Sequence, residues 1–309
     1  IPQVTLGFEL AITELAAELG IDPIEFRLMN AVEQGDANMM GAPYNRIGLR
    51  ECLEVARNHE HYKSAVADGA GRGVAMGYWI NAGMQSSATL NVIADGHVAI
   101  LTGSPDIGGS RASMALMASE VLGIPFEQIH PQVAATDAVG HTDLTGGSRT
   151  TLATGQAVIQ AAEQCVAELC RRAAAEWEVE PGVVTWSQGA AHYGDQSLTF
   201  EELASRAGAM GGPLTFSSSL TSTSTAPGFG VHICDAEVDK ETGRTTITRY
   251  TAIQDAGKAI HPDYVEGQMQ GGAVQGIGWA LNEEYLYTDE GALENPGFLD
   301  YRIPVASDL

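Results

Sequence analysis

The chain has 309 residues, of which 44% are hydrophobic, and a formal net charge of −23 from 39 acidic and 16 basic residues. This length and apolar content suffice for one large domain or two moderate ones with buried cores. The charge disfavours nucleic acid and anionic membranes as partners, and no stretch approaches the ~18 apolar residues of a membrane span. A solubilising surface is the favoured interpretation of the charge, ahead of a specific cationic partner.

The cysteines, Cys52, Cys165, Cys170 and Cys234, form no Cys-x-x-Cys pair. Their spacing therefore offers neither a zinc nor an iron–sulfur site, and it does not resemble a disulfide framework. This favours a reducing compartment, the cytoplasm, with the periplasm left as the alternative.

Two helices are predicted within residues 4–33, the second opened by Asp22-Pro23, and a third over about residues 49–61. The first helix has near-helical spacing at Leu6, Leu10, Thr13, Leu15 and Leu19. The chain starts at Ile1 without a signal peptide and stops abruptly at Leu309, which suggests that it is cut from something longer.

From Ala70 the pattern changes to strands. The stretch "ATLNVIADGHVAILTG" predicts a hairpin turning at Asp95-Gly96, followed by the loop "GSPDIGGSR" and the helix "ASMALMASEVLG". The same order recurs about 145 residues later, in a hairpin turning at residues 241–243 and the helical run "GQMQGGAVQGIGWALNEEYL". A short helix is predicted in "SLTFEELASRAG", and residues 217–230 are the best linker or crossover candidate.

These elements predict an α+β fold of two related hairpin–loop–helix units with mixed sheets, preceded by a helical segment. The predicted boundaries are 1–66 for the helical segment, 67–225 for a first α+β lobe and 226–309 for a second α+β lobe that is incomplete at its C-terminus.

Three glycine-rich segments, 103–111, 145–155 and 267–278, are predicted as loop-to-helix junctions. A helix N-terminus offers unpaired N–H groups, and glycine lets a ligand approach the backbone. Side-chain donors at the first two are Ser110, Arg111, Ser148, Arg149 and Thr150. Any single junction is open to a packing role. Because none carries the Gly-Lys-Ser/Thr of a phosphate loop, the three together suggest a long polar ligand held at several points.

At these residues the sequence resembles the molybdenum-cofactor-binding subunit of the molybdenum hydroxylases, the xanthine dehydrogenase and aldehyde oxidase family. The resemblance covers nearly the whole chain. Its segments are "PQVTLGFELAITELAAELGIDPIEFRLMN", "DGHVAILTGSPDIGGSRASMALMASEVLGIP", "GGSRTTLATGQAVIQAA", "VEGQMQGGAVQGIGWALNEEYLY" and "GFLDYRIPVASDL".

The resemblance implies a pyranopterin cofactor, molybdopterin cytosine dinucleotide, whose dithiolene sulfurs rather than side chains hold the molybdenum. By motif matching, the implied cofactor-binding residues are Gly108, Gly109, Ser110 and Arg111 at the family's Gly-Gln-Gly position, Gly147, Ser148, Arg149 and Thr150 in the second segment, the pterin-contacting Gln275, and Gln3 beside an upstream loop. Gly109 stands where the family motif has glutamine, which removes one side-chain hydrogen bond.

The implied reaction oxidises a carbon of an N-heterocyclic, aromatic or aldehyde substrate with water as the oxygen source, and electrons leave through [2Fe-2S] clusters and FAD on partner chains or domains. Tyr78 and Trp79 align with positions lining the family's substrate pocket, although ordinary core aromatics are an equal alternative. The family's general base, a glutamate in a Gly-x-Gly-Glu segment, is expected beyond Leu309, so no catalytic residue is named and the chain alone is expected to be inactive. The alternative is a non-catalytic structural or assembly module, or an inactive truncated fragment, of such a complex.

Overall fold

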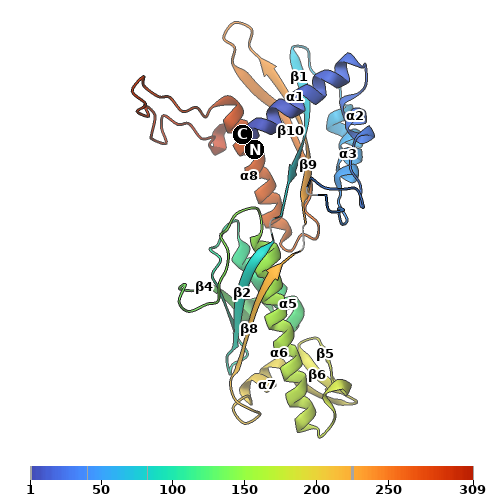
Figure 1. The fold of residues 1–309 in the computed structure, drawn as a ribbon, viewed down its shortest axis with the longest axis vertical. Coiled ribbons are helices and arrows are strands. Elements are labelled where there is room, and N and C mark those ends of the chain that lie inside the picture. The colour runs from blue at the N-terminus through green and yellow to red at the C-terminus, as the bar shows by residue number, and fades with distance from the viewer. Residues whose placement is uncertain (1, 40, 82, 224–225, 309) are drawn as a thin grey trace. The chain divides into compact units, whose positions relative to one another are not determined.

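The computed structural model describes residues 2–39, 41–81, 83–223 and 226–308. The chain forms two compact units: unit 1 combines Ile1–Trp79 with Pro227–Leu309, and unit 2 is the continuous segment Ile80–Ala226 (Figure 1). Helices and sheets both contribute, which confirms the predicted α+β class. The predicted boundary at residue 67 lies elsewhere in the structure, because the strand Ala70–Trp79 pairs with Gly228–Val238 and so belongs to unit 1.

Unit 1 packs helices against a three-stranded antiparallel sheet of order β1-β9-β10. Its elements are α1 (Pro2–Glu18), α2 (Pro23–Met29), α3 (Leu49–Asn58), α4 (Glu60–Lys63), β1 (Ala70–Trp79), β9 (Gly228–Val238), β10 (Thr245–Asp255), α8 (Pro262–Leu281) and a final 3-10 turn Ala306–Asp308. The helices at the N-terminus and the second hairpin are therefore confirmed. Asp22 caps α2 as its sequence predicts, accepting hydrogen bonds from the Ile24 and Glu25 N–H groups.

The core of unit 1 lies between α2, α3 and one face of the sheet, where Ile24, Leu53 and Ile233 are fully buried. Alternate strand residues point to opposite faces, so only every second residue of β1 and β9 reaches this core. Two buried or half-buried ion pairs reinforce it, Glu9 with Arg27 and Asp235 with Arg72.

Unit 2 is built on a four-stranded mixed sheet of order β4-β3-β2-β8, in which only β3 and β4 are parallel. Its elements are β2 (Met84–Val92), β3 (Val98–Thr102), α5 (Ser110–Leu122), a 3-10 turn Phe126–Gln128, β4 (Ile129–Val133), a π-helical turn Thr150–Thr154, α6 (Gly155–Glu176), a 3-10 turn Pro181–Val183, β5 (Thr185–Ser187), β6 (Ala190–Tyr193), β7 (Gln196–Thr199), α7 (Phe200–Ser205) and β8 (Leu214–Ser222). Strands β5, β6 and β7 form a small separate sheet.

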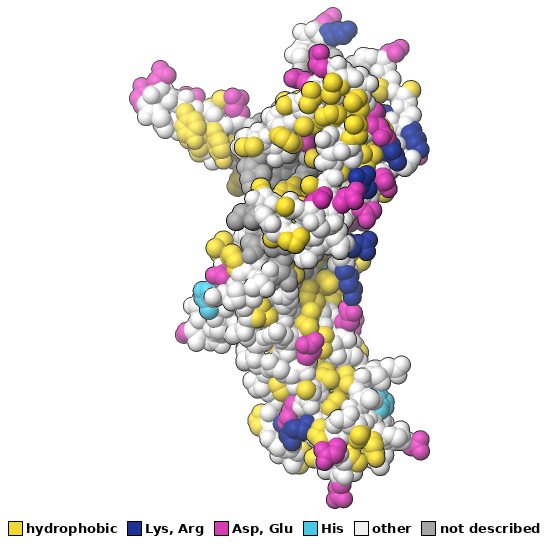
Figure 2. Space-filling view, turned by 45° about the vertical axis from the view of Figure 1, so that its right-hand side comes forward, with side chains coloured by type: hydrophobic (Ala, Val, Ile, Leu, Met, Phe, Trp, Pro, Cys, Tyr) yellow, Lys and Arg dark blue, Asp and Glu magenta, His cyan; other side chains and the backbone are white. Residues whose placement is uncertain are grey.

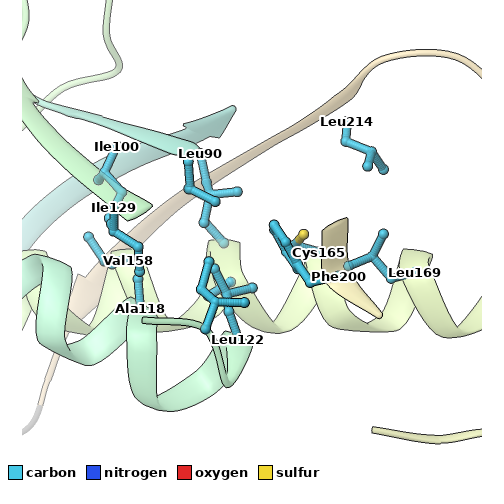
Figure 3. Close-up of a cluster of buried hydrophobic side chains, with 14 of the residues drawn as sticks. Leu90, Ile100, Ala118, Leu122, Ile129, Val158, Cys165, Leu169, Phe200 and Leu214 are labelled. Atoms are coloured by element: carbon cyan, nitrogen blue, oxygen red, sulfur yellow. The ribbon is translucent and has the colours of Figure 1, made fainter. Parts of the chain in front are cut away.

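The core of unit 2 fills the space between this sheet and the helices α5 and α6 (Figure 3). Leu90 and Ile100 point from the sheet toward Leu122 of α5 and Val158 of α6, and all four are buried. Helix α5 ends at Gly123, whose left-handed φ of 70° few other residues adopt. Gly123 also lies so close to Gly189 that a Cβ would fall 2.4 Å from the Gly189 nitrogen.

Three predictions of detail need correction. Within the predicted linker or crossover 217–230, residues 217–222 are instead the end of β8, because they pair in register with Met84–Thr89 of β2, whereas the chain does cross from unit 2 to unit 1 between residues 226 and 227. Residues 267–278 are not a loop-to-helix junction but lie inside the continuous helix α8. The two hairpin–loop–helix segments occur, but in sheets of different strand order, β4-β3-β2-β8 and β1-β9-β10.

Candidate functional site

The second predicted junction is a loop that Arg149 fastens to the start of β2. Each of the three guanidinium nitrogens donates: Nε to the Gly83 carbonyl at 2.8 Å, Nη1 to the Asp143 carbonyl at 3.0 Å, and Nη2 to the Gln85 carbonyl and the Ser86 hydroxyl. The side chain is 0% exposed. The expected role of Arg149 as a clamp on a ligand is therefore corrected: its donors are consumed within the protein, and it positions the loop.

Side chains on both sides of this loop add further anchors. Asp143 accepts a hydrogen bond from the Gln85 N–H at 2.7 Å and lies 3.2 Å from His141 Nε2. The Gln85 N–H, and then His141, lower the pKa of Asp143. The Asn81 amide donates to the Ser148 carbonyl at 3.0 Å. The loop is thus anchored at several points by contacts within unit 2.

This anchored loop leaves a set of donors unused at the start of α6. The Thr145 and Thr150 hydroxyls are buried and have no hydrogen-bond partner in the part of the chain that the structure describes. Gly147 and Ser148 have left-handed φ values of 69° and 55°, and their N–H groups donate to no described residue. Buried polar groups are nearly always paired in native proteins, so this cluster has the chemistry of a site for a polar or anionic ligand.

The first junction is arranged differently, because it carries its own carboxylate. Asp106 accepts hydrogen bonds from the Arg111 N–H at 3.0 Å and from the Ser110 hydroxyl at 3.4 Å, and its Oδ2 lies 2.9 Å from Arg111 Nε. The Arg111 N–H, and then its side chain, lower the pKa of Asp106. Ser110 and Arg111, expected as ligand donors, are instead engaged with Asp106. What remains open among the described residues are the N–H groups of Gly108 and Gly109, which have φ values of 61° and 77°.

The two junctions of unit 2 meet at Thr154. Its hydroxyl lies 3.0 Å from the Ser86 hydroxyl and 2.9 Å from that of Ser104, which follows β3. All three residues are buried. The structure therefore brings the loops 103–111 and 141–150 to one end of the unit 2 sheet, joined by a buried network of hydroxyls.

The other predicted cofactor contacts lie in unit 1. Gln275 is exposed in the middle of α8, and Gln3 is exposed in the first turn of α1. Neither has a hydrogen-bond partner among the residues that the structure describes, so both amides are free to bind a ligand.

Tyr78 and Trp79 do not form a shared aromatic surface. Tyr78 packs against Phe229, with ring centroids 5.1 Å apart, and lies beside Tyr44 at the core of unit 1. Trp79, the next residue of β1, points to the other face and is 41% exposed. Tyr78 therefore contributes to packing, and of the predicted pair only Trp79 is available to a substrate.

Sequence reasoning missed Asp106 and the unused hydroxyl of Thr145. The signal was available for Asp106, since an aspartate just ahead of a helix commonly caps it. Among the described residues no group of three or more His, Cys, Asp or Glu side chains is placed to hold a metal ion. Over the same residues, no helix has the length and apolar character needed to cross a membrane.

Two polar loops that meet at one end of a sheet, with unpartnered donors between them, are suited to binding a polar cofactor. Residues 49–309 match the family model of the molybdopterin cofactor-binding domain, and the chain belongs to this family. It is 31% identical, over its full length, to the putative xanthine dehydrogenase molybdenum-binding subunit of Escherichia coli (strain K12), of which it covers 44%. It is 29% identical, over 98% of its length, to the aldehyde oxidoreductase molybdenum-binding subunit of the same strain, of which it covers 42%.

Among solved structures, quinoline 2-oxidoreductase from Pseudomonas putida 86 matches with a TM-score of 0.88 over 99% of this chain and 43% of that chain. At 24% identity this likeness shows the shared fold. The chain thus spans less than half the length of these relatives. The resemblance found in the sequence is confirmed.

Proposed function

We propose that the chain is the molybdenum-cofactor-binding portion of a molybdenum hydroxylase that oxidises a carbon of an N-heterocyclic, aromatic or aldehyde substrate, with water as the oxygen source. Family membership and the oxidoreductase relatives support the class. The observation that carries the assignment of a site is the cluster of unpartnered buried hydroxyls, Thr145 and Thr150, beside free N–H groups at the start of α6.

The donor set fits molybdopterin cytosine dinucleotide. This cofactor presents polar pterin edges and a diphosphate, and the loop offers the Gly147 and Ser148 N–H groups with the hydroxyls of Ser148 and Thr150. Arg149 would hold this loop without touching the ligand. When bound, the cofactor supplies molybdenum and its redox chemistry, while these residues bind and orient it.

The first junction suits a neutral part of the same ligand. Asp106 and Arg111 neutralise each other there, so the junction has no net charge to attract phosphate, whereas the N–H groups of Gly108 and Gly109 can donate to an uncharged polar edge. We assign Gln275 and Gln3 as further contacts, and Trp79 to the substrate side. Electrons would pass to [2Fe-2S] clusters and FAD on partner polypeptides in the cytoplasm, and the general base would come from a segment outside this chain.

The test is to purify the complex that contains this chain from its source cells. Molybdenum is measured by mass spectrometry, and cytidine monophosphate is measured after acid hydrolysis. We expect both in equimolar amount with the chain. Finding neither in an intact, active complex would overturn the proposal and leave a structural or assembly module as the function.

A pair of variants tests the site itself. Thr150→Val keeps the shape of the side chain but removes the unpartnered hydroxyl, so molybdenum occupancy should fall several-fold. Thr215→Val, at an exposed position of β8, is the matched control and should leave occupancy unchanged. Equal occupancy in both variants would show that the Thr150 hydroxyl does not contact the cofactor.

A further inference from the structure

Arg149 is a buried cation that no carboxylate of the described residues touches. Its side chain is 0% exposed and donates to the carbonyls of Gly83, Asp143 and Gln85 and to the Ser86 hydroxyl. All four acceptors are uncharged. The Asp143 carboxylate accepts the Gln85 N–H instead, and it acts on Arg149 only through space. The hydrogen bonds of Arg149 are therefore satisfied, but its charge is not neutralised by contact.

This positive charge persists in the folded protein. Burial lowers the pKa of Arg149 and the Asp143 charge raises it, but an arginine stays protonated at any pH at which proteins fold. A buried charge is costly unless an opposite charge accompanies it. The chain as a whole is acidic, with a net charge of −23, and acidic side chains are spread over the face shown in Figure 2. Arg149 is thus a positive centre in an acidic protein, and burial limits its screening by salt.

Three unpartnered hydroxyls belong to the same unit. Those of Thr145 and Thr150 lie on either side of Arg149 in the sequence, and the third is that of Ser222, the last residue of β8. Ser222 is 7% exposed, and its hydroxyl has no partner among the described residues. Buried hydroxyls are nearly always paired, so these three indicate a polar ligand group.

Strand β8 brings the Ser222 hydroxyl to the start of α6. Alternate residues of β8 face this helix, and Ser218 donates to Gln160 in its second turn at 2.7 Å. Ser222 lies on the same face of the strand, about 13 Å further along. There it pairs with Met84 at the start of β2, and β8 contacts the π-helical turn Thr150–Thr154. Ser222 thus approaches the start of α6 from a strand, whereas the two threonines approach it from the loop.

We infer that Arg149 is the counter-charge of an anionic ligand group bound at the start of α6, and that it acts through space rather than by contact. Ser222 donates a hydrogen bond to this group, together with the Thr145 and Thr150 hydroxyls. Donors on a strand and on a loop come from several directions, which suits the tetrahedral oxygens of a phosphoryl group better than a planar carboxylate. The sign of the charge follows from Arg149 alone. That the group is the diphosphate of the cofactor rests on the proposed function.

The charge is tested with inorganic pyrophosphate as the probe, by isothermal titration calorimetry on the full chain at constant ionic strength. Replacing Arg149 would also release the loop, so the variant is Asp143→Asn, which keeps an oxygen for the Gln85 N–H and removes the opposing charge. We expect pyrophosphate to bind at least about threefold more tightly than to the wild type.

Asp195→Asn removes the same charge from the exposed turn between β6 and β7, beyond the other end of α6, and is the matched control. It should change the affinity for pyrophosphate by less than about twofold. Equal affinities in the two variants would overturn the inference, as would no binding of pyrophosphate to the wild type.

The hydroxyl is tested with Ser222→Ala. This variant loses a donor to a charged group, so the affinity for pyrophosphate should fall about tenfold. Without pyrophosphate the midpoint of thermal unfolding should not fall, because the hydroxyl has no described partner to lose. Ser217→Ala, at an exposed position on the other face of β8, is the matched control and should keep the wild-type affinity. A lower midpoint with unchanged affinity would show that Ser222 only packs β8.

The same variants separate this inference from the proposed function. Molybdenum and cytidine monophosphate are measured in the purified complex. If the variants leave pyrophosphate binding unchanged while the wild-type complex contains molybdenum, this inference alone fails. If they change it as expected while the intact, active complex contains neither molybdenum nor cytidine monophosphate, the proposed function alone fails.

Discussion

Replacing Arg149 with methionine is the most informative perturbation of unit 2, because it keeps the apolar stem and removes only the guanidinium. The carbonyls of Gly83, Asp143 and Gln85 and the Ser86 hydroxyl then lose their donor. Each buried group that is left without a partner costs about 1–3 kcal/mol. The total loss is smaller than the sum of these costs, because water reaches part of the loop and because the variant no longer buries a charge. We therefore expect Arg149→Met to lower the free energy of unfolding of unit 2 by about 3–5 kcal/mol.

The assay is urea unfolding followed by fluorescence, in which Trp177 and Trp186 report on unit 2. Arg206→Met, in which a partly exposed arginine of unit 2 loses its surface ion pair with Glu176, is the control and should change the free energy of unfolding by less than about 1 kcal/mol. If Arg149→Met stays within that same range, these four hydrogen bonds do not hold the loop, and Arg149 would again be a candidate ligand contact.

Two further predictions concern the packing of unit 2. Hydrogen bonds from Arg171 and Arg172 lower the pKa of Glu168 to about 2, from about 4.3 in the unfolded chain. The ionised Glu168 therefore stabilises the folded state fully above about pH 4.3, and this stabilisation disappears as the pH falls toward about 2. The stability difference between wild type and Glu168→Gln, from urea unfolding at stepped pH, should vanish over that window; a constant difference contradicts the assignment. Gly123→Ala should lower the free energy of unfolding by more than about 2 kcal/mol, because its Cβ meets the Gly189 backbone. Gly194→Ala, left-handed but in open space, should lose only about 1 kcal/mol, and equal losses would refute the effect of the close approach.

Local patterns predicted local structure well in this chain. The hairpin turning at Asp95-Gly96 and the cap at Asp22 need only neighbouring residues to form, so their sequences specify them. The same reasoning failed for residues 267–278. Their glycines resemble a loop, but the helix that contains them extends from Pro262 to Leu281, and propensity is a weak guide over so long an element.

The candidate site was predictable in place but not in detail. Glycines, hydroxyls and an arginine at the start of a helix pointed to residues 145–155, where the Thr145 and Thr150 hydroxyls are buried without a partner among the described residues. Whether Arg149 turns toward a ligand or toward the carbonyls of Gly83 and Gln85 depends on a strand more than sixty residues away, which local spacing does not encode. For the same reason the sequence did not show that Tyr78 packs in the core while Trp79 is exposed, since the placement of β1 in its sheet decides which of two neighbouring side chains faces the core.

The insertion of unit 2 into unit 1 sets an order for folding during synthesis. Strand β1 leaves the ribosome long before its partner β9, and the segment between them, about 150 residues, takes roughly 7–30 s to translate. Unit 2 is continuous, so it can fold during that interval, with β2 waiting for β8 at its far end. Strand β1 and the apolar side chains of α2 and α3 must meanwhile stay unpaired. We therefore expect β1 and the apolar faces of α2 and α3 to be exposed to aggregation during synthesis, and slowing translation should raise aggregation through unit 1 before unit 2.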